Sequence, residues 1–154
     1  MTKPLIGAFL AVAVAAVAGA TIAVAATPAE TITIRQNNFK QIGRAQKSLS
    51  DELKKPAPDV AVLRASAQTL ATFAPQVNRW FPRGSGKETG AKTGALPAIW
   101  QQTPRFNASA AQFVAAATGL QRAAATGDAA RVRAAFPAVG ASCKGCHDTF
   151  KGDK

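Results

Sequence analysis

Apolar residues recur at helical spacing in four stretches of this chain, over residues 28–54, 59–77, 103–126 and 128–151. Within each stretch they follow one another at steps of three, four or seven residues, which places them on one face of an α-helix. No stretch alternates apolar and polar residues as a half-buried strand does, so the pattern predicts an all-α fold. The predicted inward positions are Ile32, Phe39, Ile42, Leu49 and Leu53; Val60, Leu63, Ala67, Leu70, Ala74 and Val77; Phe106, Ala110, Phe113, Ala117, Leu120 and Ala124; and Val132, Phe136, Val139, Cys143, Cys146 and Phe150.

Signals for the ends of these helices are local. Thr27 is followed by a proline and, three residues later, by Glu30, which is the pattern of a capping box at a helix start. Thr103 is also followed by a proline, so we expect it to cap the third helix, and Asp128 is placed to cap the fourth. Pro137 lies inside the fourth helix and should bend it, because it removes one backbone hydrogen bond.

A long connection separates the second and third helices. Residues 78–97 are rich in Gly, Pro, Lys and Thr, which favours irregular structure over a helix or a strand. Pro75, just before it, predicts a kink or the end of the second helix. Bundles of four helices accommodate one long crossover of this kind. The chain is therefore predicted to fold as an antiparallel four-helix bundle.

Near the C-terminus, residues 143–147 form the motif C-x-x-C-H. This is the pattern at which c-type haem attaches: the two thiols bond to the porphyrin vinyl groups, and the imidazole binds the iron as proximal ligand. A thioredoxin-like redox pair, half of a zinc site and a chance pair of buried cysteines are the alternatives. These fit poorly, because no βαβ unit is predicted and the chain has no other Cys or His. The motif therefore predicts one covalent haem c near the C-terminal helix, bound by Cys143 and Cys146, with its iron held by His147.

The first 26 residues have the pattern of a secretory signal peptide. Lys3 gives a positive start, and an apolar run from Leu5 to Ala25 ends in small residues. An uncleaved anchor is the alternative, because about 20 apolar residues can span a bilayer. The alanine-rich run and its small-residue ending favour cleavage, after Ala25 or Ala26. Since covalent haem attachment follows export, we expect residues 27–154 to form a single periplasmic domain.

The chain is strongly basic, with 19 Lys and Arg against 8 Asp and Glu and a net charge of +11. Nucleic acid is a poor candidate partner, because the cations are scattered and an exported protein meets no duplex. A basic surface that attracts acidic partners is the simpler interpretation.

The chain offers few candidates for a sixth ligand to the iron. Met1 is the only Met and leaves with the predicted leader, and His147 is the only His. The usual sixth ligands of electron-transfer cytochromes, Met and a second His, are therefore missing from residues 27–154. A lysine, a water molecule or an open position remain.

Four antiparallel helices, a long middle connection and C-x-x-C-H on the last helix together resemble the cytochrome c′ family, which are periplasmic four-helix-bundle haem proteins. Ordinary small cytochromes c carry the motif near the N-terminus instead. The resemblance covers nearly all of residues 27–154 and includes several separate segments. They are Ile34-Arg35-Gln36 with Phe39-Lys40 and Ile42-Gly43, Leu96-Pro97-Ala98-Ile99-Trp100, Arg133-Ala134-Ala135-Phe136, and Val139-Gly140-Ala141-Ser142-Cys143-Lys144.

This resemblance implies roles for further residues. Phe39 matches the position over the distal face of the iron, although an ordinary core aromatic is the alternative for it. Arg35 and Gln36 match positions near the haem propionates, where a guanidinium pairs well with carboxylate. Lys151 matches a basic residue on the proximal side. The resemblance also implies a homodimer through the first helix, and Phe150 stands where a hydroxyl-bearing aromatic is more usual.

With Phe39 over an open iron position, we expect a five-coordinate, high-spin haem that binds small neutral gases. NO and CO can pass an apolar ring, whereas anions meet a desolvation penalty, and O₂ finds no hydrogen-bond donor on Phe39. The predicted function is NO sequestration without catalysis. A one-electron carrier that docks on an acidic periplasmic partner is the alternative. A peroxidase or NO-reducing enzyme would need a distal acid–base pair, and only Arg35 and Gln36 are near.

Overall fold

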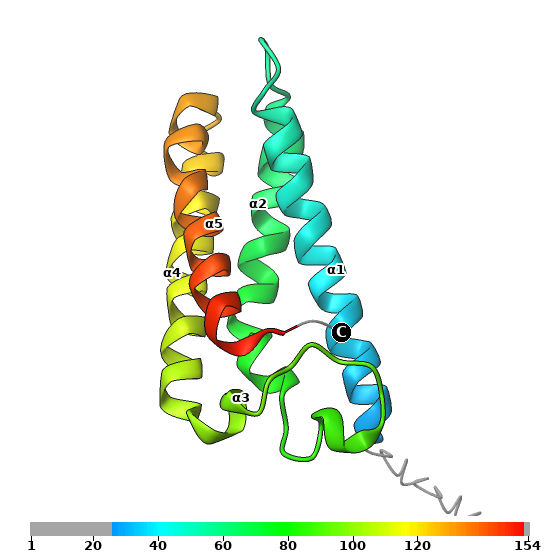
Figure 1. Cartoon of the computed structure of the whole chain (residues 1–154). Coiled ribbons are helices and arrows are strands. Elements are labelled where there is room, and N and C mark those ends of the chain that lie inside the picture. Colours follow the sequence, from blue (N-terminus) through cyan, green and yellow to red (C-terminus); the bar gives the residue numbers. More distant parts are fainter. Residues whose placement is uncertain (1–25, 153–154) are drawn as a thin grey trace, which may run out of the picture.

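The computed structural model describes residues 26–152, so the predicted leader lies outside the described residues except for Ala26. Four long helices run alternately up and down along one axis (Figure 1). This architecture confirms the predicted antiparallel four-helix bundle. The long helices are α1 (Pro28–Glu52), α2 (Val60–Phe73), α4 (Thr103–Ala125) and α5 (Ala129–Phe150), and the short elements are the 3₁₀ helices η1 (Ala74–Trp80) and η2 (Lys87–Thr89) and the helix α3 (Ala98–Gln101).

Two predicted helix starts are confirmed by their hydrogen bonds. The backbone N–H of Thr27 donates to the Glu30 carboxylate at 2.7 Å, and the Thr27 hydroxyl accepts from the Glu30 N–H at 3.2 Å. The Asp128 carboxylate accepts from the N–H of Ala130 at 2.8 Å at the start of α5. Both caps satisfy backbone donors that have no partner within their own helix.

The predicted start of the third long helix is wrong by one residue. Gln102 is the N-cap of α4, and it makes no side-chain capping bond. Thr103 is already helical, and its hydroxyl donates back to the carbonyl of Trp100 at 3.2 Å. The cause is the short helix α3, which ends directly before α4 and supplies a nearer acceptor. A helix of four residues has no apolar period, so the sequence pattern did not predict it.

The two proline predictions concern α2 and α5. Helix α2 ends at Phe73 and is followed directly by the 3₁₀ helix η1, whose first turn contains Pro75. Of the two possibilities predicted for Pro75, a kink or the end of the helix, the structure shows the end of the α-helix. Helix α5 continues through Pro137 to Phe150. No helix within residues 26–152 is both long and apolar enough to cross a membrane.

The apolar faces of the four long helices meet in one core. In α2 with its extension η1, and in α4, the predicted stripe is buried at every position but Val60. In α1 and α5 most of it is buried, but Phe39, Phe136, Cys143 and Cys146 are only partly covered. Three of these four line a cavity, which accounts for their partial exposure.

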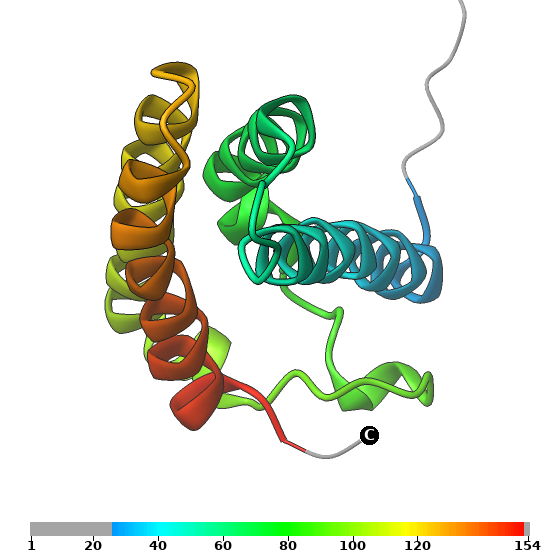
Figure 2. The same ribbon diagram turned by 90° about the horizontal axis from the view of Figure 1, so that it is seen from above.

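Helix α1 packs on α2, α2 on α4 and α4 on α5, whereas direct packing of α1 on α5 is sparse. Viewed from above, the N-terminal part of α1 diverges from α5 (Figure 2). The connection before α3 passes between the N-terminal end of α1 and the C-terminal end of α5. At the opposite end, the Arg133 guanidinium of α5 donates to the carbonyl of Leu53 at 2.7 Å. The bundle is therefore closed at one end and open between α1 and α5 at the other.

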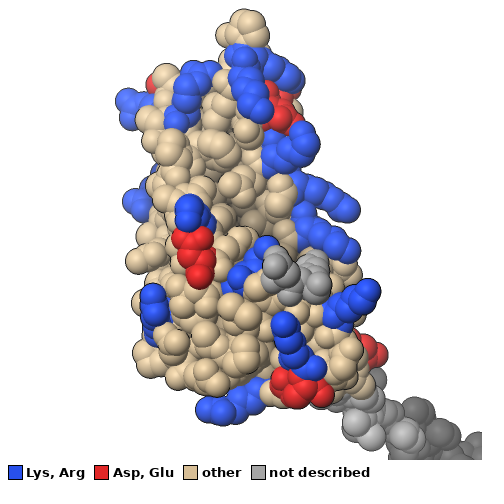
Figure 3. All heavy atoms as spheres, viewed as in Figure 1, with Lys and Arg blue, Asp and Glu red and all other residues tan. Residues whose placement is uncertain are grey.

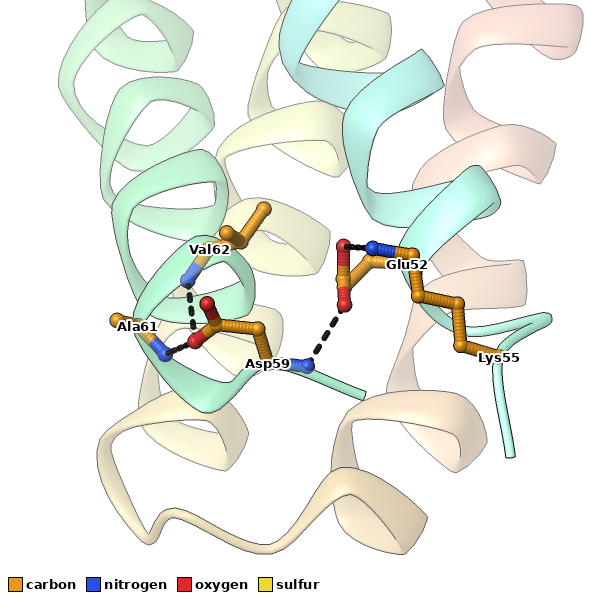
Figure 4. A network of polar contacts seen from close by, with 5 residues as sticks. All are labelled: Glu52, Lys55, Asp59, Ala61 and Val62. Atoms are coloured by element: carbon orange, nitrogen blue, oxygen red, sulfur yellow. Dashed lines mark hydrogen bonds and ion pairs between the residues drawn. The ribbon is translucent and has the colours of Figure 1, made fainter. Parts of the chain in front are cut away.

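The closed end, called the turn end below, comprises residues 49–63 and 120–132. Its α1–α2 turn is held by the buried carboxylate of Glu52 (Figure 4). That carboxylate accepts from the backbone N–H of Asp59 and from the ammonium of Lys55, both at 2.7 Å. The two hydrogen bonds lower the pKa of Glu52, the Asp59 backbone bond more strongly. A charged carboxylate is thus part of the turn in the folded protein.

Candidate haem site

A cavity of about 350 Å³ lies between α1, α4, α5 and the connection before α3. All seven predicted site residues line it, so the fold brings together positions more than 100 residues apart. They are Arg35, Gln36, Phe39, Cys143, Cys146, His147 and Lys151. The cavity and its surrounding residues are called the cavity end below.

One wall of the cavity is the last two turns of α5. Cys143, Cys146 and His147 stand at positions i, i+3 and i+4, so the helix presents all three on the same face. Both thiols are free and partly buried. Burial raises the pKa of Cys143 and of Cys146, and the neighbouring Cys143 raises that of Cys146 further. Before haem is attached, both side chains are therefore neutral thiols at neutral pH.

His147 lies on the exposed side of this wall. Partial desolvation of its imidazole lowers the pKa of His147, the charge of Lys151 lowers it further, and Asp148 opposes both. A neutral imidazole is the form that binds a metal. Lys151 caps the end of α5, where its backbone N–H donates to the His147 carbonyl at 3.1 Å.

Aromatic rings form a continuous series of contacts behind the cavity. Phe39 meets Trp80 edge-on at 5.2 Å between ring centroids and lies 6.1 Å from Phe81. The series continues from Phe81 to Phe106 at 5.1 Å and from Phe106 to Phe150 at 5.2 Å. All of these pairs except the tilted Phe39–Phe81 pair are edge-to-face, which is a favourable geometry for aromatic rings. They link α1, η1, the connection, α4 and α5 into one apolar surface.

Arg35 is the buried cation of the site, with 2% of its surface exposed. Its guanidinium lies 4.7 Å from the centroid of the Phe81 ring and donates to two hydroxyls, Ser85 at 2.9 Å and Thr93 at 2.7 Å. Burial lowers the pKa of Arg35, and the distant charge of Glu88 opposes that shift. Within residues 26–152 no carboxylate forms an ion pair with it.

Neither hydroxyl could be identified from the sequence, because Ser85 and Thr93 lie in an irregular segment with no recognised motif. Gln36, which was expected near the propionates, also lines the cavity, and its amide donates to the carbonyl of Lys92 at 2.8 Å. Arg35 and Gln36 therefore both attach the connection to α1. The only sequence signal for these contacts was the pair of polar residues beside the inward stripe of α1.

The connection is also attached to the end of α5. The N–H of Leu96 donates to the Phe150 carbonyl at 3.1 Å, and the N–H of Gly152 donates to the Gly94 carbonyl at 2.9 Å. The backbones approach so closely that a Cβ added at Gly94 would lie 2.7 Å from the Gly152 oxygen. Glycine is therefore required at position 94 by space rather than by backbone angle.

The residues of the cavity fit a covalently bound haem. Two thiols and a neutral imidazole share one helix face, and aromatic rings form much of the remaining lining. Among residues 26–152, the charged lining residues are cations that suit the two carboxylates of a porphyrin. Among residues 26–152 no cluster of three or more His, Cys, Asp or Glu could hold a metal ion. Fold and site together define a c-type haem protein built on a four-helix bundle.

Comparison with known proteins gives the family. The family model for cytochrome C′ matches residues 30–151. Cytochrome c′ of Rhodopseudomonas palustris is 36% identical over 139 residues, covering 90% of this chain and 91% of the relative. Cytochrome c′ of Pararhodospirillum photometricum is 33% identical over 126 residues, covering 82% of this chain and 99% of the relative.

A solved structure agrees with these relatives. The crystal structure of cytochrome c′ from Thermochromatium tepidum superposes with a TM-score of 0.78 at 30% identity, covering 83% of this chain and 98% of that one. The chain belongs to the cytochrome c′ family. Its cofactor is accordingly haem c, covalently attached, with its iron.

Proposed function

We propose that this haem protein binds small neutral gases, NO and CO, at a five-coordinate iron, and that it sequesters NO. One observation carries the proposal: residues 27–154 contain no Met and only one His. The haem supplies an iron that takes ligands at an open axial position when only one protein side chain binds it. His147 is the proposed proximal ligand. Residues 27–154 then contain no second His and no Met that could bind the iron from the opposite face.

The proposal gives each lining residue a task. Cys143 and Cys146 form the two thioether bonds to the haem. Phe39 covers the distal face, and its ring is held from behind by Trp80 and Phe81. Arg35 and Gln36 lie toward the propionates, and Lys151 lies on the proximal side next to His147.

The lining of the cavity supports selection by size and polarity. Phe39 offers no hydrogen-bond donor, which disfavours O₂ relative to NO and CO. Among residues 26–152, neither Asp nor Glu lines the cavity, so this part of the chain offers no lining carboxylate for general acid–base catalysis. We therefore propose binding rather than catalysis as the role of the site.

Related structures support NO as the ligand and a dimer as the assembly. Solved structures of cytochrome c prime from Alcaligenes xylosoxidans include nitric oxide complexes of variant proteins at 30% identity and TM-scores of 0.75. Another cytochrome c′, at a TM-score of 0.80, is described as having ligand-controlled dimer dissociation. We propose a homodimer through α1, where Ile34 is half exposed on the outer face.

One-electron transfer in the periplasm is the second candidate function, favoured by charge. Lys and Arg side chains follow the α1 side of the face shown in Figure 3, and few acidic side chains accompany them. Lys40 and Lys151 line the cavity itself. Such a surface would attract an acidic redox partner. Export of the mature chain, residues 27–154, to the periplasm is part of both proposals.

Absorption spectra of the ferrous protein before and after addition of NO and CO test the gas-binding proposal. Both gases should shift the Soret band, and resonance Raman of the resting ferric protein at pH 7 should report high-spin, five-coordinate iron. A purely low-spin ferric spectrum, with no response to either gas, would reject the proposal. It would indicate that a lysine binds the iron and would leave electron transfer as the better function.

A further inference from the structure

Three buried polar side chains meet where α1 contacts the connection before α3. Arg35 is 2% exposed, Ser85 is 1% exposed and Thr93 is 4% exposed. Arg35 Nη1 donates to Ser85 Oγ at 2.9 Å, and Nη2 donates to Thr93 Oγ1 at 2.7 Å. The two hydroxyls lie 50 and 58 residues away along the chain. The orientation of the guanidinium therefore depends on the tertiary structure.

Each hydroxyl is itself held in place by a second hydrogen bond. Ser85 Oγ donates to the carbonyl of Pro82 at 2.8 Å, and Thr93 Oγ1 accepts from the backbone N–H of Ala95 at 3.1 Å. A hydroxyl with two fixed partners has little freedom to rotate away from the guanidinium. The arrangement therefore holds Arg35 in one orientation.

The charge of Arg35 is not balanced by these contacts. Both hydroxyls are neutral, and they accept two of the five N–H donors of a guanidinium. Glu88 acts on Arg35 only from a distance, since its carboxylate accepts from the Gly86 N–H at 2.9 Å. A buried cation without an anionic partner is unfavourable. Because Arg35 lines the cavity, an anion can reach it from that side.

We propose that Ser85 and Thr93 are positioning residues, whose hydroxyls hold the Arg35 guanidinium toward a carboxylate of the haem and so raise the reduction potential of the iron. A fixed positive charge near the iron stabilises the ferrous state, which carries one positive charge fewer. Without the hydroxyls the guanidinium can turn toward water, where its charge is screened. The inference rests on the placement of Arg35 near the propionates in the proposed function.

The test compares reduction potentials of holoproteins by spectroelectrochemical titration. Ser85→Ala and Thr93→Val remove one hydroxyl each, and each should lower the ratio of ferrous to ferric protein at a fixed potential by about three- to tenfold, or about 30–60 mV. Thr93→Ser retains the hydroxyl and should keep the wild-type potential. Ser66→Ala is the control, because Ser66 is a buried serine of α2 outside the cavity lining.

Thermal midpoints separate this role from simple support of the loop. If Thr93→Val lowers the midpoint and leaves the potential at the wild-type value, the hydroxyls only hold the connection and the inference is wrong. The Thr93→Val and Thr93→Ser pair decides the matter if Ser85→Ala does not fold. Gas binding is measured in a separate experiment. If the wild-type protein binds neither NO nor CO, the proposed function is wrong, but the comparison of reduction potentials remains valid.

Discussion

The two ends of this bundle are built from different side chains. The turn end is aliphatic, with Leu49, Leu63, Leu120 and Val132 almost completely buried. The cavity end is aromatic, and its rings contact one another from α1 to α5 around a space of about 350 Å³. Aliphatic side chains fill a core closely, whereas large planar rings in edge contact can form the walls of a space.

The polar groups of the two ends differ in the same way. At the turn end, the Glu52 carboxylate finds both of its partners within the protein. At the cavity end, the Arg35 guanidinium finds two neutral hydroxyls and, among residues 26–152, no carboxylate that pairs with it. The turn end is therefore complete as a protein structure, while the cavity end is built for a further, anionic group. Four sets of substitutions test this difference, beginning with the largest expected effect.

The double variant Cys143→Ala/Cys146→Ala should lose covalent haem altogether, and Cys146→Ala alone should retain at most one thioether bond. Both changes lie at the cavity end, and neither removes a residue of the turn end. Mass spectrometry of acid-denatured protein measures the outcome. The wild type should appear at the mass of the chain plus haem, and a dominant apo mass in the wild type would contradict the assignment.

Leu120→Ala and Phe39→Ala compare the two interiors directly. Leu120→Ala creates a cavity in a closely packed region and should cost about 2–5 kcal/mol of the free energy of unfolding. Phe39 is only partly buried at the cavity wall, so Phe39→Ala should cost less, about 1–3 kcal/mol, because full burial corresponds to about 3–5 kcal/mol. Chemical denaturation of both holoproteins measures these values.

The rate of ligand binding in Phe39→Ala should rise, although its stability falls. Flash photolysis should show faster CO association in Phe39→Ala, because the ring over the proposed ligand position is gone. Leu120→Ala should leave the rate at the wild-type value. If Phe39→Ala loses stability without any change in CO association, Phe39 is a packing residue and another side chain covers the distal face.

Glu52→Gln should change how stability depends on pH. The pKa of Glu52 is lowered in the folded protein, so its carboxylate stabilises the fold above the pKa of the unfolded chain, about 4.3. That contribution is lost as the pH falls through the folded-state pKa. The thermal midpoint of Glu52→Gln should therefore lie below the wild type at pH 7, and the difference should narrow below about pH 4. Asp51→Asn, at a neighbouring exposed carboxylate, should show a smaller difference.

Lys144→Ala should have the smallest effect. Lys144 pairs with Asp148 on the exposed surface of α5, and exposed ion pairs contribute about 0–1 kcal/mol. Lys47→Ala removes the equivalent surface pair with Asp51 on α1. Urea denaturation should place both variants close to the wild type. A large loss at Lys144 alone would show that the two ends differ at the surface as well as in the interior.

Local signals in the sequence predicted most of the fold. The capping box at Thr27 and the cap at Asp128 involve only residues a few positions away, so they could be recognised without the structure. The start at Thr103 was misplaced because its hydroxyl has a nearer acceptor in a helix too short to show a period. Pro75 marked the end of α2 because the loss of one backbone donor is also a local effect.

The same distinction between local and long-range signals applies to the candidate site. Cys143, Cys146 and His147 lie within five residues, so their spacing alone identified them. Ser85 and Thr93 could not be predicted, because nothing in residues 82–95 indicates which helix that segment will contact. Their roles depend on Arg35 in α1, which lies 50 and 58 residues away along the chain. A group of site residues that lies within about one helical turn can be recognised in the sequence, whereas contacts made by a long loop cannot.

The series of aromatic contacts also determines what optical spectroscopy will detect in this protein. The chain has two tryptophans and no tyrosine. Trp80 contacts Phe39, and Trp100 lies 6.4 Å from the Phe81 ring, so both indoles belong to the cavity end. Haem quenches the emission of nearby indoles by energy transfer, and a rise in tryptophan fluorescence during unfolding will therefore report the opening of the cavity end. Loss of helix at the turn end alone will leave the tryptophan fluorescence unchanged and will instead reduce the helical signal in circular dichroism.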